Sequence, residues 1–279
     1  MLIINWKANV VSKKGWKWAN DSRRLFISPG REPGQSCLIL NSIPKSGTHL
    51  LYQVLKPLML NDFGGFLATT PSVSLKRRSP AEHIYYLERL FNRELISAHM
   101  HFDMSVASTI ERLERPMITI IRDPRDVFIS ELDYLSEVNR WHRMHRYYRK
   151  VTNFESAFSL CLEGLPQAPF CYPSFAERIK PYLGWLEDPS TLIVRFDQLR
   201  NENTQLNEMT RIVRYLGEVG LWLDDEATFI ERSRDSIDPT ASHTFRQGGV
   251  GSWRERLSGE QAEQLEGMIS PLASVMGYP

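Results

Sequence analysis

The sequence predicts an α/β domain in which a central parallel sheet is flanked by helices. Three short, largely apolar runs, 37–40, 117–121 and 191–196, are candidate strands, and the first has the composition of a strand that is buried on both faces. Residues with helical periodicity follow each run, and strands that alternate with helices favour parallel pairing through right-handed crossovers. Polar loops follow the first two runs, at the edge of the sheet where such folds bind ligands.

The first strand, over 37–40, leads into the polar loop 41–49. After this loop the spacing of apolar side chains predicts the buried face of a helix, formed by Leu50, Leu51, Val54, Leu55 and Leu58. The second strand, over 117–121, is β-branched and is followed by the turn 122–126, which has helix-capping character. A helical face comes next, with Val127, Phe128, Leu132 and Leu135. The third strand, over 191–196, precedes a helix that we expect over 204–216.

The chain has 279 residues, enough for one large domain to bury a sizeable core. No break in composition marks a second domain, so we expect a single domain over 36–279. Residues 1–35 are polar and include the turn-rich run 29–34. They are expected to form a surface segment that leads into the domain.

Composition excludes several classes of function. The 34 Lys and Arg nearly balance the 33 Asp and Glu, and a net charge of +1 argues against a bulk binder of nucleic acid or membrane surfaces. No apolar run approaches the roughly 18–20 residues that span a bilayer, so we expect no stable membrane insertion. The start of the chain does not resemble a secretion signal. The three cysteines form no CxxC pair, which argues against a disulfide framework and a structural zinc site, and we expect a cytoplasmic protein.

The segment 44–49, Pro-Lys-Ser-Gly-Thr-His, has the chemistry of a phosphate-binding loop. Gly47 allows backbone N–H groups to approach an anion, and a helix N-terminus offers unpaired donors. Lys45 adds a charge, while Ser46 and Thr48 add hydroxyl donors. The nucleotide-hydrolase motif GxxxxGK[ST] is absent, and an ordinary capped helix start with an exposed lysine is the alternative interpretation.

The segment 122–130, Arg-Asp-Pro-Arg-Asp-Val-Phe-Ile-Ser, is a second candidate phosphate contact. Arg122 leaves the end of a strand and can direct two donors at a phosphate. Ser130 lies about two helical turns further on and is predicted to face the same site. Asp123 and Asp126 are expected to cap the helix or to lie near its positive end. Alternatively, Arg122 only pairs with Asp126 and Ser130 has no special role.

The segment 244–253 is the third candidate, because its clustered glycines allow a loop to close over a ligand and Arg246 offers a further phosphate contact. A mobile turn before the last helix is the alternative. The order PKSGTH, IIRDPRDVFIS, RQGGVGSW resembles the soluble sulfotransferases that use 3′-phosphoadenosine 5′-phosphosulfate (PAPS). The resemblance spans about residues 37–257, and it implies that the polar loop is a P-loop-like phosphosulfate-binding loop.

The resemblance also implies roles for individual residues. The 5′-phosphosulfate is expected to contact Lys45, Ser46, Gly47, Thr48 and His49. The 3′-phosphate is expected to contact Arg122 and Ser130, and to be covered by Arg246, Gln247 and Gly248. Phe196 stands where the family usually has a tyrosine near the adenine.

Sulfuryl transfer needs a base for the acceptor's proton and a cation for the leaving oxygen. The run 95–99 reads as a strand that ends in His99 and is similar to the family's catalytic segment, in which a lysine lies two residues before the histidine. Here that residue is Ser97. His99 is our predicted base, with His101 as the alternative, and Lys45 is the predicted cation. Both histidines are ordinary structural residues in the competing interpretation. No metal is expected, since lysine and arginine neutralise the phosphates.

The predicted function is therefore the PAPS-dependent sulfation of a hydroxyl group on a small molecule. A kinase-like phosphotransferase is an alternative, suggested by the apolar run that ends at Asp197, although the missing GxxxxGK[ST] argues against it. A non-catalytic nucleotide-binding protein is a third possibility, motivated by Ser97. The arginine-rich run 139–150 is expected to form a basic helix stripe, either solvated or part of an acceptor site. The sequence determines neither the acceptor nor the oligomeric state.

Overall fold

The structure of the chain is a computed structural model that describes residues 36–167, 172–222, 224–238 and 249–278. Its centre is a five-stranded sheet with the order β2-β3-β1-β4-β5, in which every neighbouring pair is parallel. The strands are β1 (Leu38–Ser42), β2 (Asn61–Ala68), β3 (Glu94–His99), β4 (Met117–Ile121) and β5 (Thr191–Arg195). The predicted α/β domain with a central parallel sheet is thereby confirmed.

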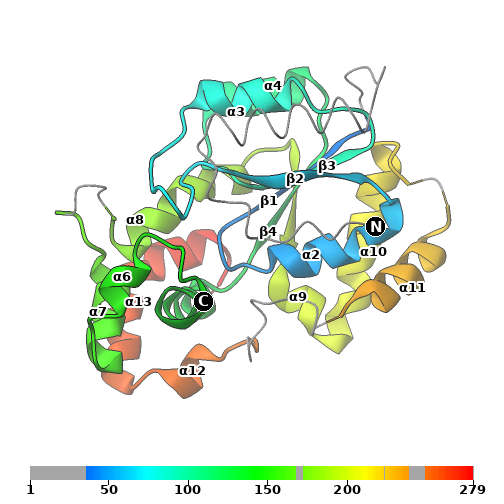
Figure 1. Ribbon diagram of the computed structural model, residues 1–279. Helices are drawn as coiled ribbons and strands as arrows, with labels where there is room; N and C mark the ends of the chain where they lie inside the picture. The colour runs from blue at the N-terminus through cyan, green and yellow to red at the C-terminus, as the bar shows by residue number, and fades with distance from the viewer. Residues whose placement is uncertain (1–35, 168–171, 223, 239–248, 279) are drawn as a thin grey trace.

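Helices cover both faces of the sheet (Figure 1). One layer contains α2 (Thr48–Val54), η2 (Lys56–Leu58), α9 (Phe196–Arg200), α10 (Glu202–Glu218) and α11 (Glu226–Ser236), and the opposite layer contains α3 (Pro80–Leu87) and α4 (Met104–Arg112). Side chains alternate along a strand. In β1, Leu38 and Leu40 therefore pack into the core of the first layer, whereas Ile39 packs into the core of the second.

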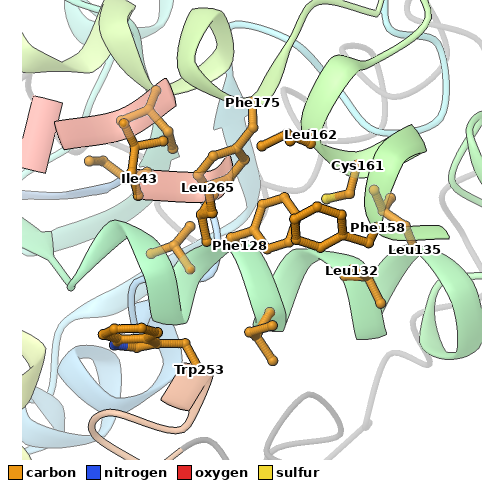
Figure 2. Close-up of a cluster of buried hydrophobic side chains, with 14 of the residues drawn as sticks. Ile43, Phe128, Leu132, Leu135, Phe158, Cys161, Leu162, Phe175, Trp253 and Leu265 are labelled. Carbon is orange, nitrogen blue, oxygen red and sulfur yellow. The ribbon is translucent and has the colours of Figure 1, made fainter. Parts of the chain in front are cut away.

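A third group of helices gathers at one end of the sheet. It comprises α5 (Pro124–Asp133), the π-helical turn η3 (Tyr134–Val138), α6 (His145–Tyr148), α7 (Phe154–Glu163), α8 (Phe175–Ile179), η4 (Lys180–Leu186), α12 (Trp253–Arg256) and α13 (Gly259–Val275). Figure 2 shows the core that they share, in which the ring of Phe128 lies edge-on to Phe158 and Phe175, with centroids 5.1 Å away in both cases. This packing fixes α5, the helix that directly follows Arg122.

Three details differ from the sequence-based expectations. The edge strand β2 was not predicted, because Asp62, Gly64 and Gly65 interrupt its alternation, and its register with β3 shifts between Asp62 and Phe66. Phe196 begins α9 and does not end the preceding strand. The run 139–150 is not one basic helix, since only His145–Tyr148 is α-helical and Arg143 donates to the Ser74 carbonyl at 2.8 Å.

The prediction of a surface segment over 1–35 lies outside the described residues. The domain boundary at 36 therefore stays a prediction. Within the described part of the chain, no helix combines the length and the hydrophobicity that a bilayer span requires.

Candidate active site

The candidate site lies at the carboxyl edge of the sheet, around β1 and its neighbours. The chain crosses from β1 to one side of the sheet through β2 and β3, and then to the other side through β4 and β5. The junction of β1 and β4 is thus a topological switch point, the place where open α/β sheets form a crevice. The 41–49 loop, of which residues 43–47 connect the end of β1 to the start of α2, lies here, and Arg122 follows β4.

The 41–49 loop has a left-handed backbone at two positions, with φ of 71° at Lys45 and 100° at Gly47. Only glycine suits the second position, because a Cβ atom there would lie 2.4 Å from Cδ2 of Phe196. Thr48 begins α2, and His49 is exposed on its first turn. The loop, the start of α2 and Phe196 are therefore in close contact.

Two hydroxyl groups of this loop differ in their surroundings. Thr48 Oγ1 lies 2.8 Å from Ser42 Oγ, so it is hydrogen-bonded within the protein. Ser46 is fully buried, and its Oγ has no hydrogen-bond partner among the described residues. Buried hydroxyl groups in native structures normally have partners. Ser46 Oγ is therefore a candidate contact for a ligand.

The ammonium group of Lys45 lies 4.0 Å from the ring centroid of Tyr134, the first residue of η3. The pKa of Lys45 is lowered to about 8, chiefly by burial and to a smaller extent by the nearby Arg122, while Glu131 opposes the shift. At neutral pH the ammonium group is charged but poorly compensated, a state that an anion would stabilise. The aromatic contact with Tyr134 was not foreseen from the sequence.

Arg122 is buried at the junction of the two loops. Its Nη1 is 3.5 Å from the carbonyl oxygen of Lys45, and its Nη2 donates to the carbonyl of Gly249 at 3.1 Å. The guanidinium carbon lies 4.5 Å from the ring centroid of Phe196. The Nε–H group is buried and has no partner within the described ranges. Arg122 thus joins the 41–49 loop, Phe196 and Gly249, and it keeps one donor unused.

The other predicted nucleotide contacts are placed less fully. Ser130 lies half-buried in the second turn of α5, the helix that follows Arg122. Arg246, Gln247 and Gly248 lie outside the described residues, so the structure does not bear on their predicted roles. Gly249 and the residues after it are described, and they adjoin Arg122 and Asp126.

Asp123 and Asp126 have different roles at the start of α5. Asp123 is the N-cap, and its carboxylate accepts from the backbone N–H of Arg125 at 2.9 Å. Asp126 does not cap the helix. Its carboxylate accepts from Gly251 N–H at 2.8 Å and from Ser252 Oγ at 2.9 Å. Both acids lie at the positive end of α5, as expected, with Asp123 as the cap and Asp126 in the first turn. The sequence did not predict that the Asp126 carboxylate accepts hydrogen bonds from a distant segment.

His99 ends β3 beside the end of β1. Its Nδ1 is 3.0 Å from the carbonyl oxygen of Ser42 and 3.0 Å from Ser42 Oγ. A carbonyl oxygen can only accept, so Nδ1 carries the proton and Nε2 carries the lone pair. The ring stacks on Phe66 with centroids 5.0 Å apart. Burial lowers the pKa of His99 to about 4, so the ring is neutral at pH 7 and has the lone pair that a base needs.

His101 and Ser97 have other environments. The ring of His101 packs edge-on against Tyr182 of η4, 4.7 Å between centroids, and burial lowers its pKa to about 4 as well. Ser97, at the position of the family's lysine, is buried within β3 between Leu40 of β1 and Phe66 of β2. Asp197, the magnesium ligand of the kinase alternative, accepts from Tyr278 at 2.5 Å and from Gln198 at 3.1 Å.

No group of three or more His, Cys, Asp or Glu side chains in the described ranges could hold a metal ion. The fold and the polar switch point define a doubly wound α/β protein with the candidate site between β1 and β4. Residues 35–277 match the sulfotransferase domain family, and the chain therefore belongs to the sulfotransferases.

Individual relatives agree with this assignment. The chain is 22% identical to cytosolic sulfotransferase 17 of Arabidopsis thaliana over 273 residues, which cover 85% of this chain and 74% of the relative. Its fold resembles mouse sulfotransferase SULT7A1 complexed with PAP, with a TM-score of 0.59, 17% identity and coverage of 89% and 87% of the two chains. It also resembles retinol dehydratase in complex with androsterone and the inactive cofactor PAP, with a TM-score of 0.55, 14% identity and coverage of 94% and 88%.

Proposed function

We propose that the protein transfers a sulfuryl group from PAPS to the hydroxyl group of a small molecule. The proposal rests on one observation above all: Ser46 Oγ and Arg122 Nε are buried donors without partners in the described part of the chain. They belong to two separate motifs, and the contact between Arg122 and the Lys45 carbonyl brings these motifs together. A ligand with anionic groups on both sides of this contact would satisfy both donors.

The residues present fit a nucleotide of this kind. Lys45, Ser46 and Thr48 would contact the 5′-phosphosulfate, while Arg122 and Ser130 would contact the 3′-phosphate. Because Gly47 has no side chain, the phosphosulfate could approach the backbone closely there. Phe196 would lie near the adenine. Arg246, Gln247 and Gly248 are proposed to complete the site. When bound, PAPS supplies a sulfuryl group on a good leaving phosphate.

His99 is proposed as the general base. Its Nε2 would take the proton of the acceptor hydroxyl as the new O–S bond forms and the S–O bond to phosphate breaks. The Ser42 carbonyl would stabilise the resulting imidazolium by accepting from Nδ1–H. Lys45 would neutralise the charge on the leaving phosphate oxygen. With Ser97 in place of the family's lysine, Lys45 carries this task without that second cation.

The acceptor is proposed to be a small molecule with a hydroxyl group, held at the carboxyl edge near His99. Retinol dehydratase, one of the structural neighbours, has been captured with androsterone and with retinol. A cytoplasmic location is proposed from the likeness to a cytosolic sulfotransferase. The catalytic domain is proposed to extend over 36–279.

The proposal is tested by incubating the purified protein with radiolabelled PAPS and pools of phenols, steroids, lipids, sugars and other alcohols. Labelled sulfate is expected to appear on at least one pool. Transfer of phosphate from ATP and not of sulfate from PAPS would instead identify a kinase-like enzyme. Binding of 3′-phosphoadenosine 5′-phosphate (PAP) without transfer to any pool would identify a non-catalytic binding protein.

The role of His99 is tested with His99→Ala. Loss of a general base is expected to lower kcat by about a hundredfold or more, with the affinity for PAP unchanged. His101→Ala serves as the matched variant, because this neighbouring histidine is also neutral at pH 7. A large loss in His101→Ala together with normal turnover in His99→Ala would transfer the role to His101.

A further inference from the structure

Asp126 has an environment that its position at the start of α5 does not explain. It is 1% exposed, and both of its carboxylate oxygens are used by a distant segment. Oδ2 accepts from Gly251 N–H at 2.8 Å, and Oδ1 accepts from Ser252 Oγ at 2.9 Å and from Trp253 N–H at 3.2 Å. A buried carboxylate is costly unless it is hydrogen-bonded, so these contacts are needed to keep it in place.

The same carboxylate lies beside Arg122. Asp126 Oδ2 is 3.9 Å from Arg122 Nη2, and that Nη2 also donates to the Gly249 carbonyl at 3.1 Å. The segment 249–253 is therefore joined to Arg122 directly, through Gly249, and indirectly, through Asp126. Burial lowers the pKa of Arg122, and Asp126 is the largest opposing influence. Asp126 thus stabilises the buried guanidinium in its charged form.

These contacts leave one buried donor of the guanidinium group without a partner among the residues described. Nη2 faces Gly249 and Asp126, Nη1 faces the Lys45 carbonyl, and Nε is the donor with no partner among the residues described. We propose that Asp126 is a positioning residue, which orients Arg122 toward the nucleotide's 3′-phosphate and couples that subsite to segment 249–253. This inference rests on the proposed function, since it concerns the same nucleotide.

The consequence is selective. A nucleotide with a 3′-phosphate depends on the orientation of Arg122, whereas adenosine 5′-phosphate (AMP) lacks the group that Arg122 would contact. Loss of Asp126 is therefore expected to weaken PAP much more than AMP. A residue that only stabilised the fold would affect the two nucleotides alike.

The test is calorimetric titration of PAP and of AMP into wild type, Asp126→Asn, Arg122→Ala and the double variant. Asp126→Asn is expected to weaken PAP by about tenfold, as for loss of a charge-assisted hydrogen bond, and to change AMP less than about twofold. In the Arg122→Ala background, the same change is expected to have little further effect on PAP. Glu226→Gln, which breaks the exposed pair with Arg214, is the control and should bind both nucleotides normally.

Equal losses for PAP and AMP, additive losses in the double variant, or unchanged or tighter PAP binding by Asp126→Asn would each overturn the role of Asp126. Failure of the nucleotide site itself is separate, since wild type would then bind PAP no tighter than AMP, and failure of sulfuryl transfer alone would appear in the assay with radiolabelled PAPS. If Asp126→Asn does not fold in a thermal melt, Ser252→Ala replaces it, because this variant removes one donor and keeps the carboxylate. It should weaken PAP by about threefold with AMP unchanged, and no selective loss in Ser252→Ala would also overturn the inference.

Discussion

The 41–49 loop and the 122–126 turn follow neighbouring strands, and they differ in how they present hydrogen-bond donors to a ligand. Each connects a parallel strand to a helix at the switch point. The first uses backbone: two left-handed residues lead into α2, whose N-terminus has no side-chain cap within the described residues. The second uses side chains: Asp123 caps α5, Pro124 occupies its first turn, and Arg122 projects from the strand end. The uncapped start of α2 leaves backbone N–H groups available to a ligand. At the capped start of α5, the donor available to a ligand is the side chain of Arg122.

The largest effect on stability and on PAP binding is expected from Gly47→Ala, which alters the backbone of the 41–49 loop. The added methyl would lie 2.4 Å from Phe196 in a backbone conformation with φ of 100°. Strain and overpacking together should lower the free energy of unfolding by about 2–4 kcal/mol and abolish PAP binding. Denaturant unfolding and calorimetry measure the two effects.

Gly220→Ala is the matched control for this variant. Gly220 also has a positive φ, of 70°, but its added Cβ would meet no described atom within 4 Å. In Gly220→Ala, only backbone strain should lower the free energy of unfolding, and PAP binding should be normal. Equal destabilisation in both variants would mean that contact with Phe196 does not matter.

Arg122→Ala removes the side chain that the 122–126 turn presents to the nucleotide. We expect a loss of about 10–100-fold in affinity for PAP, because a charge-assisted contact to phosphate is removed, and a much smaller loss for adenosine 5′-phosphosulfate. Lys45→Ala should weaken both ligands, since each has a 5′-phosphate group. The two loops would not divide the nucleotide as proposed if calorimetry gave Arg122→Ala equal losses for both ligands.

The pH dependence of PAP binding tests the contribution of Lys45 separately from that of Arg122. The free protein's Lys45 has a pKa of about 8, and a bound anion would favour its charged form. PAP affinity should therefore change little below pH 7, be about halved at pH 8 and fall above it by at most about tenfold per unit. The phosphates titrate near pH 6 and arginine far higher, so neither contributes in this range. Lys45→Arg should remove the decline, and its persistence there would assign it to another group.

The smallest effect is expected from Asp123→Ala. This change removes the cap of α5 and the ion pair of Asp123 with Arg125, which is 2.8 Å long. Unfolding free energy should fall by about 1–2 kcal/mol, as followed by thermal melting. Nucleotide affinity should stay within about twofold, because Arg122 is held by Phe196, Gly249 and Asp126. A selective loss of PAP affinity would show that the cap also orients Arg122.

The strands and the two loops were largely predictable, because apolar runs and capping residues are local signals. The contacts that complete the site were not. Lys45 meets Tyr134, and Asp126 meets 251–253, across separations that depend on the order of strands in the sheet. Asp126 has the local sequence of a helix-end acid, and only the tertiary structure shows its distant partners. The edge strand β2 was missed because its glycines and Asp62 interrupt the alternation of apolar and polar residues that is typical of a strand.

The partner of His99 Nδ1 is a main-chain oxygen, that of Ser42. No substitution at residue 42 can delete this group, so the tautomer of His99 does not depend on any single side chain. It depends on the alignment of β1 with β3, which pairs Asn41 with Ala98. A slip of one residue between these strands would turn alternate side chains to the wrong face and take the carbonyl away from the ring. Mutations that impair the base without touching it should therefore be sought between the two strands, at Leu40, Ile96 and Ala98.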